Sequence, residues 1–275
     1  MMEFKLFKKN AEKQERDDIN SIREAILQKL EEYTKTEVVR FELEEAEAGI
    51  FDSKIGGAYY VAKDRKPPEE EETNQPMYLL AQVNFGEIPQ IESFPEKGLL
   101  QIFISSDDMY GCDFDDPYNQ KSWRIDYYEE LPASVDASCI YEPEWEEDVN
   151  LPLMDQVTYR LHPVEDEQII TLGDMHFEEV AEACLDEEMI EALDDDDVFD
   201  YLAERLQPLD CQIGGYPFFT QEDPREDDEE EILLFQLAST EEIMWGDEGV
   251  GNFFISREDL ENRDFSHVMY NWDCY

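Results

Sequence analysis

Residues 55–60 read IGGAYY, and residues 213–218 read IGGYPF. Each Gly-Gly pair is followed by an apolar run that contains one glutamine, LLAQV at 79–83 and LLFQL at 233–237. Short apolar runs bounded by turn residues are typical of β-strands. Because the blocks recur in the same order with loops of different length between them, the sequence predicts a duplicated unit whose strands keep their register.

A third pair of blocks extends this repeat. LQIFIS at 100–105 and NFFIS at 252–256 both end in serine. Other β-branched or aromatic runs begin at Val38 and are separated by Gly, Pro, Asn and Asp, as strands are. We therefore expect an α+β fold, mainly antiparallel β, with two pseudo-symmetric β-rich halves produced by an internal duplication.

Two stretches have the helical period instead. In residues 11–33 apolar side chains recur at steps of three and four, which predicts an amphipathic helix. The same period returns over 174–206, where Asp174 is a predicted N-cap. The run Asp194–Asp197 predicts a break that divides this second stretch into two helices, since Asp is a poor interior helix residue and a good cap.

These patterns predict the domain organisation. The chain is expected to have an N-terminal helix and one large domain, in which a helical bridge joins the two halves. The expected boundaries are 1–37 for the helix, 38–275 for the domain, 38–173 for the first half, 174–206 for the bridge and 207–275 for the second half.

The charge of the chain excludes several classes of partner. There are 72 Asp and Glu residues against 21 Lys and Arg, a formal net charge of −51. Nucleic acid and anionic membranes need a basic face, so we expect neither as a partner. Residues 1–40 are neutral in sum, and the acidic remainder is predicted either to attract a basic protein partner or to serve solubility.

The cysteines predict a reducing compartment. Cys112, Cys139, Cys184, Cys211 and Cys274 are scattered, odd in number and form no C-x-x-C pair. The start of the chain has no apolar run of the secretory kind, and no stretch approaches the 18 or so apolar residues of a membrane span. We therefore expect reduced thiols and a cytoplasmic protein.

The paired glycines Gly56, Gly57, Gly214 and Gly215 are the first candidate ligand residues. Glycine accepts a positive φ and lets another backbone or a ligand approach closely. One interpretation is a tight turn or bulge that packs one half on the other. The alternative is that the glycines form the rim of a binding site.

The glutamines Gln82, Gln101 and Gln236 lie inside otherwise apolar strands. A buried amide without partners costs about 1–3 kcal/mol, so these side chains are expected to tie strands or halves together. The alternative is a small polar pocket at the pseudo-twofold axis that recognises an amide or a peptide.

An acidic loop, residues 107–116, is the candidate metal site. It carries the carboxylates of Asp107, Asp108, Asp113, Asp115 and Asp116 around a glycine. Hard cations such as Ca²⁺ take six to eight oxygen ligands, but the loop lacks the spacing and the distal Glu of an EF-hand. A hydrogen-bonded turn exposed to solvent is the competing interpretation, and no other cofactor is nominated.

The loop MWGDEGVGN at 244–252 has three glycines after a strand. Asp247 and Glu248 would repel a phosphate, so a hairpin turn is favoured over a phosphate cradle. Trp245, Asp247 and Asn252 remain candidates for contact with a ligand or partner.

The C-terminal residues 264–275, DFSHVMYNWDCY, are too aromatic for a frayed tail. Aromatic side chains gain most of their stabilising free energy from burial. We therefore expect this segment to pack against the second half.

Several of these blocks together resemble one family. IGG before LL-x-Q, followed by LLQIFISSDDMYGCDFDDP (99–117), IGGYPFFTQEDPR (213–225), IMWGDEGVGNFFIS (243–256) and the C-terminal block, is similar to the YwqG-like family of bacterial proteins of unknown function. The resemblance covers roughly residues 50–275. It implies a mainly β fold of two similar halves with flanking helices, and it implies no activity, catalytic residue or cofactor.

The sequence nominates no enzyme. It has no G-x-S-x-G, no G-x-x-x-x-G-K-[ST] and no H-E-x-x-H motif, and its three histidines are isolated. We predict a non-catalytic acidic binding protein that engages a basic partner, for example as an immunity protein or antitoxin against a cationic toxin or nuclease. The alternative is a divalent-metal-dependent hydrolase or a small-ligand-binding protein with a pocket between the halves.

Overall fold

The fold is that of a computed structural model, which describes residues 19–145, 149–153, 156–225 and 231–275. The chain divides into two compact units. We call the first the sheet unit (Glu37–Asp166, Leu209–Gly214 and Phe219–Tyr275) and the second the helical unit (Met1–Thr36, Glu167–Pro208 and Gly215–Phe218).

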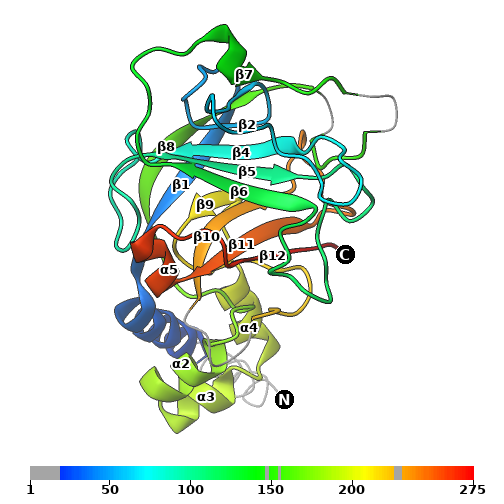
Figure 1. The fold of residues 1–275 in the computed structure, drawn as a ribbon. Coiled ribbons are helices and arrows are strands. Elements are labelled where there is room, and N and C mark those ends of the chain that lie inside the picture. Colours follow the sequence, from blue (N-terminus) through cyan, green and yellow to red (C-terminus); the bar gives the residue numbers. More distant parts are fainter. Residues whose placement is uncertain (1–18, 146–148, 154–155, 226–230) are drawn as a thin grey trace, which may run out of the picture. The chain divides into compact units, whose positions relative to one another are not determined.

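The sheet unit is built on a ten-stranded sheet in the order β12-β11-β10-β9-β1-β8-β2-β4-β5-β6 (Figure 1). Its strands are β1 (Thr36–Glu45), β2 (Lys54–Ile55), β4 (Tyr78–Asn84), β5 (Leu99–Ile104), β6 (Trp123–Tyr128), β8 (Tyr159–Gln168), β9 (Cys211–Ile213), β10 (Glu231–Ala238), β11 (Val250–Ser256) and β12 (Val268–Asp273). The predicted mainly antiparallel α+β fold is confirmed.

The order divides the sheet into two arms that match strand for strand. The first arm is β8-β2-β4-β5-β6 and the second is β1-β9-β10-β11-β12, and every pairing within each arm is antiparallel. Both arms have a register shift in the strand after the Gly-Gly pair, between Leu79 and Ala81 and between Leu233 and Phe235. The internal duplication itself stays a prediction.

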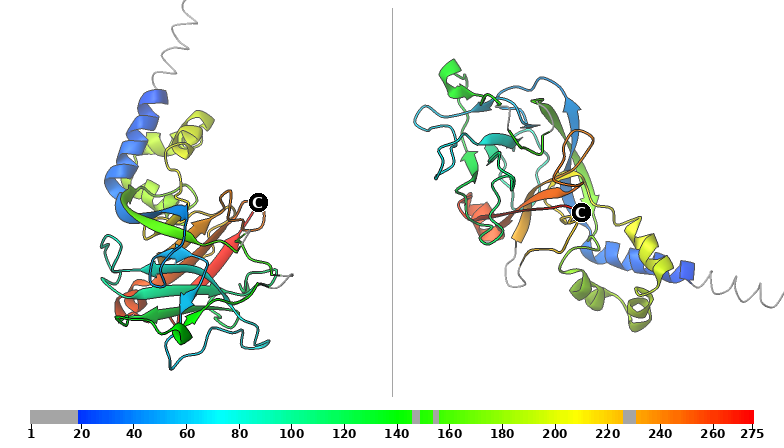
Figure 2. Two further views of the ribbon diagram at one scale, coloured as in Figure 1. Left: turned by 90° about the horizontal axis from the view of Figure 1, so that it is seen from above. Right: turned by 90° about the vertical axis from the view of Figure 1, so that its right-hand side faces the viewer.

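The sheet curls so that the inner faces of its two arms share one core (Figure 2). The ring of Trp123 on β6 lies 5.8 Å from that of Phe253 on β11 and 5.3 Å from that of Tyr270 on β12. All three side chains are fully buried. Burial of such large apolar surfaces is the main stabilising contribution to this unit.

Smaller elements cover the outer face of the first arm. β3 (Tyr59–Tyr60) pairs with β7 (Ile140–Tyr141), which follows the 3-10 helix η1 (Ala137–Cys139). Tyr59 packs on Phe103 of β5 with ring centroids 4.7 Å apart.

The short helix α5 (Arg257–Asn262) continues from β11, and the hydroxyl of Ser256 accepts the amide hydrogen of Asp259 to cap it.

The helical unit has its own apolar core. A helix over residues 19–34 supplies Ile26 and Leu30, which pack with buried residues from α2 (Phe177–Cys184) and α4 (Asp196–Ala203). The hydroxyl of Tyr216 donates to the carbonyl oxygen of Thr34 at 2.8 Å. None of the described helices is long and apolar enough to cross a membrane.

The predicted helices needed two corrections. Residues 174–206 form three helices rather than two, because α3 (Glu187–Ala192) begins at a separate cap, where Asp186 accepts the amide hydrogen of Met189. The N-cap of α2 is His176 and not Asp174, whose carboxylate accepts from the amide of His176. The predicted break is confirmed, since Asp195 caps α4. Of the predicted helix over 11–33, residues 11–18 lie outside the described part.

Candidate functional site

The paired glycines have the left-handed backbone that the sequence suggested. Gly56, Gly57, Gly214 and Gly215 have φ between 67° and 75°. A Cβ on Gly57 would stand 2.3 Å from Oγ1 of Thr158, and one on Gly56 would stand 3.0 Å from the carbonyl oxygen of Val157. The first pair therefore lies against the protein's own chain, and whether either pair has a binding role stays a prediction.

The predicted glutamines of the first arm lie in a polar row that crosses four strands. The register aligns Lys54, Gln82, Gln101 and Asp126 on β2, β4, β5 and β6. All four side chains are buried. We call this set the first polar row.

Hydrogen bonds connect the first polar row to the loop before β2. The amide of Gln82 donates to the carbonyl oxygens of Ile50 and Asp52 at 3.1 and 2.7 Å. The ammonium of Lys54 donates to the carbonyl oxygens of Gly49 and Ala58 at 3.0 and 2.6 Å. These contacts hold the loop and the Gly-Gly turn against the sheet.

The second arm has a matching row. The register aligns Gln212, Gln236, Asn252 and Asn271 on β9, β10, β11 and β12, and all four are buried. Gln212 donates to the carbonyl oxygen of Gly214 at 2.8 Å, and Gln236 donates to that of Leu209. The structure thus aligns the predicted Gln236 and Asn252 as partners in this second polar row.

Half of the residues in the two polar rows were not predicted as site residues: Lys54, Asp126, Gln212 and Asn271. Lys54 and Gln212 each stand immediately before an Ile-Gly-Gly triplet, a position that the repeat itself could have indicated. No such signal marks Asp126 and Asn271, because the face of the sheet on which each lies depends on the register of β6 and β12.

The acidic loop is organised by hydrogen bonds of its own. Oδ1 of Asp107 accepts the amide hydrogens of Met109 and Gly111, both at 2.9 Å. Asp113 accepts from the amide of Asp115 and from the side chain of Asn119. Within the described residues no three His, Cys, Asp or Glu side chains lie close enough together to hold a metal ion.

The loop at 244–252 separates its three candidate residues. Trp245 is fully buried in the core of the sheet unit, where its ring lies 5.5 Å from that of Tyr110. Asp247 is exposed, and its carbonyl oxygen accepts the amide hydrogen of Tyr275. Asn252 belongs to the second polar row, so the structure does not bring the three together.

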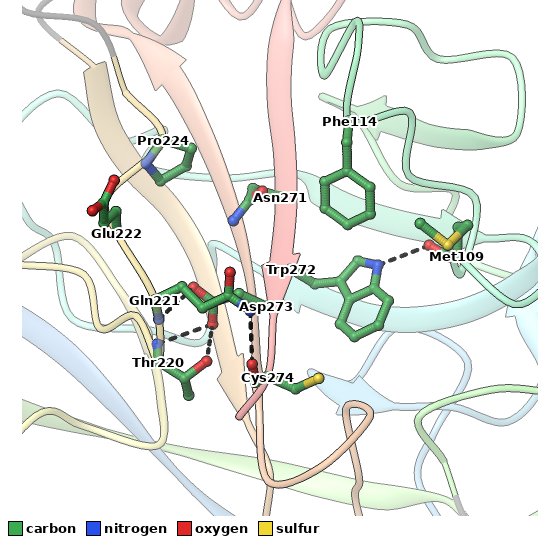
Figure 3. A pocket seen from close by; sticks show the side chains of 10 residues that line it. All are labelled: Met109, Phe114, Thr220, Gln221, Glu222, Pro224, Asn271, Trp272, Asp273 and Cys274. Carbon is green, nitrogen blue, oxygen red and sulfur yellow. Dashed lines mark hydrogen bonds between the residues drawn. The ribbon is translucent and has the colours of Figure 1, made fainter.

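A pocket of about 720 Å³ lies beside the edge strand β12 (Figure 3). We call it the β12 pocket. Three segments line it, one from the acidic loop (Met109 and Phe114), one from residues 220–224, and the end of β12 with Cys274. Figure 3 shows Phe114 and Trp272 on one side of the strand and the 220–224 segment on the other.

Hydrogen bonds fix most of the polar groups of this pocket. The carboxylate of Asp273 accepts from the amide of Thr220 at 3.0 Å and from its hydroxyl at 2.7 Å. The indole of Trp272 donates to the carbonyl oxygen of Met109 at 2.9 Å. These bonds hold the two walls in place around the strand.

The amide of Asn271 also lines the pocket. Its side chain is only 9% exposed and stands at the end of the second polar row. A side-chain amide both donates and accepts hydrogen bonds, so the end of this row offers a donor and an acceptor to whatever occupies the pocket. Phe114, on the other side of the strand, is 49% exposed.

None of the pocket's lining residues was predicted as a ligand residue. The signals in the sequence that could have indicated the pocket are the high aromatic content of residues 264–275 and the aromatic Phe114 between Asp113 and Asp115. A second pocket, of about 650 Å³, lies in the helical unit and is lined by apolar and acidic residues, among them Ile190 and Phe199.

The chain was also compared with known proteins. It matches the family described as "Domain of unknown function (DUF1963)" over residues 53–274. That range includes both polar rows and the whole lining of the β12 pocket. No curated protein matches the chain. Since the match covers most of its length, the chain belongs to the DUF1963 family of domains of unknown function.

Proposed function

We propose that this protein is a non-catalytic binding protein that engages a basic segment of a partner protein at the β12 pocket. The observation that carries the proposal is the mostly buried amide side chain of Asn271 in the lining of a pocket that also has two aromatic rings and the carboxylates of Glu222 and Asp273. An amide in such a position fits the backbone of a bound peptide.

The aromatic wall suits a cationic side chain. The rings of Phe114 and Trp272 lie 6.0 Å apart at an angle of 51°, so a lysine or arginine side chain can pack its alkyl stem against them. A cation over an aromatic face gains about 0.5–2 kcal/mol, depending on its exposure. Asp115, next to Phe114 in the chain, is an exposed carboxylate that can pair with the positive end.

The other side of the strand adds a further carboxylate. Glu222 lines the pocket, whereas the carboxylate of Asp273 is already engaged by Thr220.

A net charge of −51 also accelerates encounter with a basic molecule. The five free thiols support a reducing compartment, the cytoplasm, as the place of binding.

The two matched arms support the proposed duplication. Residues in register on the two arms correspond pair by pair, Gln82 with Gln236 and Gln101 with Asn252. We infer that the β12 pocket belongs to the second copy of the repeat. The row of the first copy ends at Asp126 on β6, and its end has a different surrounding.

Peptide titration tests the proposed function. The probe is a fluorescent ten-residue peptide of alternating lysine and glycine, and the control probe has glutamate in place of lysine. We expect saturable binding of the basic probe alone, weakened by salt. Phe114→Ala and Glu222→Gln should each weaken it about five- to tenfold.

The control variants lie in the helical unit. Phe199→Ala removes an aromatic side chain that is 53% exposed, and Glu182→Gln removes an exposed carboxylate. Both should leave binding of the basic probe unchanged. Equal weakening by all four variants, or no saturation, would show that the acidic surface attracts the peptide without a site, and the proposal would fail.

A further inference from the structure

The pocket of about 650 Å³ in the helical unit is built from one continuous stretch of the chain. Its lining residues all lie between positions 172 and 202, in α2, α3, α4 and the segments beside these helices (Figure 1). We call it the helical pocket. Most of its lining side chains are apolar, and the others are the carboxylates of Asp174, Glu178, Glu182, Glu191 and Asp194.

Two large apolar side chains of the helical pocket are exposed to solvent. Phe199 on α4 is 53% exposed, and Ile190 on α3 is 37% exposed. Val198 and Leu202 of α4 are buried in the core of the helical unit, whereas no side chain of the described helix α3 is fully buried. Exposed apolar surface that is rimmed by polar residues marks interaction sites, so this face is a candidate for a partner.

The rim of the helical pocket is negative throughout. Residues 174–204 contain 14 Asp and Glu residues and no Lys or Arg. Four exposed carboxylates line the pocket, those of Glu178, Glu182, Glu191 and Asp194. None of these four forms an ion pair within the part of the chain that the structure describes. Because unbalanced like charges repel one another, a partner with positive side chains is favoured here.

The walls of the pocket favour a helix as the occupant over an extended segment. The backbone groups inside α2, α3 and α4 are engaged in the hydrogen bonds of their own helices, so these walls offer mainly side chains. An extended peptide would leave its own amide and carbonyl groups without partners there, which is costly. A bound helix pairs its backbone internally and presents apolar side chains at steps of three and four residues.

We propose that the helical pocket binds a basic amphipathic helix of a partner protein. The apolar side chains of this helix pack against Ile190 and Phe199, and its lysine or arginine side chains pair with the carboxylates of the rim. A small apolar amine would balance a single carboxylate, whereas the negative charge here extends over all three helices. The partner helix gains affinity from the burial of apolar surface and a faster association from the complementary charge.

This site is separate from the β12 pocket. The two pockets share no lining residue and belong to different units of the chain. The lysine-glycine peptide that tests the β12 pocket has no apolar side chain to fill the helical pocket. Each of the two proposals can therefore fail without the other.

The binding of a designed helix tests the helical pocket. The probe is a fluorescent fourteen-residue peptide of leucine and lysine, in which the leucines recur at steps of three and four. The control peptide has the same composition in an order that gives no apolar face. We expect saturable binding of the probe, about tenfold or more tighter than that of the control peptide. Equal binding of the two peptides would show attraction by charge alone and would overturn the proposal.

Substitutions at exposed positions locate the bound probe. Phe199→Ala and Ile190→Ala should each weaken its binding about five- to tenfold, since both remove apolar surface that the helix buries. Tyr33→Ala is the matched control, because Tyr33 is a 59% exposed aromatic side chain of the same unit that does not line the pocket. Tyr33→Ala and Phe114→Ala should leave binding of the probe unchanged. Equal weakening by all four variants, or by none, would overturn the proposal.

Hydrogen exchange of the parent protein provides a test that needs no substitution. The probe should slow amide exchange within residues 177–203 and leave exchange in β11 and β12 unchanged. Slower exchange in β12 without any change in residues 177–203 would assign the probe to the β12 pocket and overturn the proposal. Unchanged exchange in both regions would overturn it as well.

Discussion

The side-chain amide of Gln101 donates to Oε1 of Gln82 at 2.8 Å, across the antiparallel pair β5 and β4. Both side chains are fully buried. The nitrogen of Gln82 in turn donates to Ile50 and Asp52, so the pair links two strands to the loop that leads into β2. These amide hydrogen bonds therefore fix the position of that loop relative to the paired strands β4 and β5.

Replacing Gln82 should destabilise the sheet unit strongly. Gln82→Leu removes the donor to the carbonyl oxygens of the half-buried Ile50 and Asp52 and the acceptor of the fully buried Gln101 amide. Each unpaired group costs about 1–3 kcal/mol, so the free energy of unfolding should fall by about 3 kcal/mol or more. Urea denaturation followed by tryptophan fluorescence measures it.

Gln28 provides the matched control. Its side chain is exposed and, in the part of the chain that the structure describes, bonds only to Glu32, one turn along its helix, so Gln28→Leu should change the free energy of unfolding by less than about 0.5 kcal/mol. Equal effects of the two substitutions would contradict a structural role for Gln82. An unchanged stability together with lost ligand binding would instead favour the polar pocket that the sequence left open.

The lowered pKa of Lys54 should raise the free energy of unfolding at alkaline pH. Its side chain is 1% exposed, and burial lowers its pKa from the ordinary 10.5 to about 8. Between pH 8 and 10.5 the unfolded chain binds more protons at this residue than the folded chain, so the free energy of unfolding rises with pH. The rise over this window amounts to about 3 kcal/mol.

The pH effect is measured as a difference between variants, because tyrosines and cysteines titrate in the same range. Lys54→Met should remove the rise, whereas Lys63→Met, at an exposed lysine, should retain it. Chemical denaturation at pH 7.5, 9 and 10 gives the three values that are needed. Parallel pH dependence in the parent protein and in Lys54→Met would contradict the lowered pKa.

The sequence predicted the strand content because strands in this chain are short, apolar and separated by turn residues. It could not predict on which face of the sheet Asp126 and Asn271 lie, because that depends on their pairing with Gln101 and Asn252 across neighbouring strands. The β12 pocket was missed for the same reason. Its walls come from three distant segments that only the assembled sheet brings together.

The roles of the aspartates could not be predicted from the sequence for a different reason. In the acidic loop the metal and turn interpretations need the same residues, and only the orientation of Asp107 and Asp113 toward backbone amides shows how these carboxylates are used. Within residues 174–206 Asp186 caps a helix of its own, so this stretch has one more break than the sequence predicted.

The cysteines should react with Ellman's reagent in two groups. Burial raises the pKa of Cys112 to about 12 and also raises that of Cys211, and Cys139 is buried as well. These three thiols should be unreactive at pH 8 until the protein unfolds, because the thiolate is the nucleophile. The half-buried Cys184 and Cys274 should react in the folded protein.

The same reaction reports on the β12 pocket, since Cys274 lines it and Cys184 lies in the helical unit. The lysine-glycine peptide should slow the reaction of Cys274 and leave that of Cys184 unchanged. Mass spectrometry of the labelled peptides separates the two sites. Protection of both cysteines, or of neither, would contradict binding at the β12 pocket.

The last strand should be essential for the sheet unit. As expected, the C-terminal segment is not frayed, since β12 pairs with β11 along its whole length. The ring of Tyr270 stacks on that of Phe253 with centroids 4.5 Å apart and also contacts Trp123 of the first arm. Tyr270→Ala should therefore lower the free energy of unfolding by about 3–5 kcal/mol, and deletion of residues 268–275 should abolish cooperative unfolding.

Removal of Tyr275 alone, a side chain that is 75% exposed, is the control and should change the melting temperature by no more than a few degrees. A protein without residues 268–275 that melts like the parent would show that β12 does not hold the two arms together.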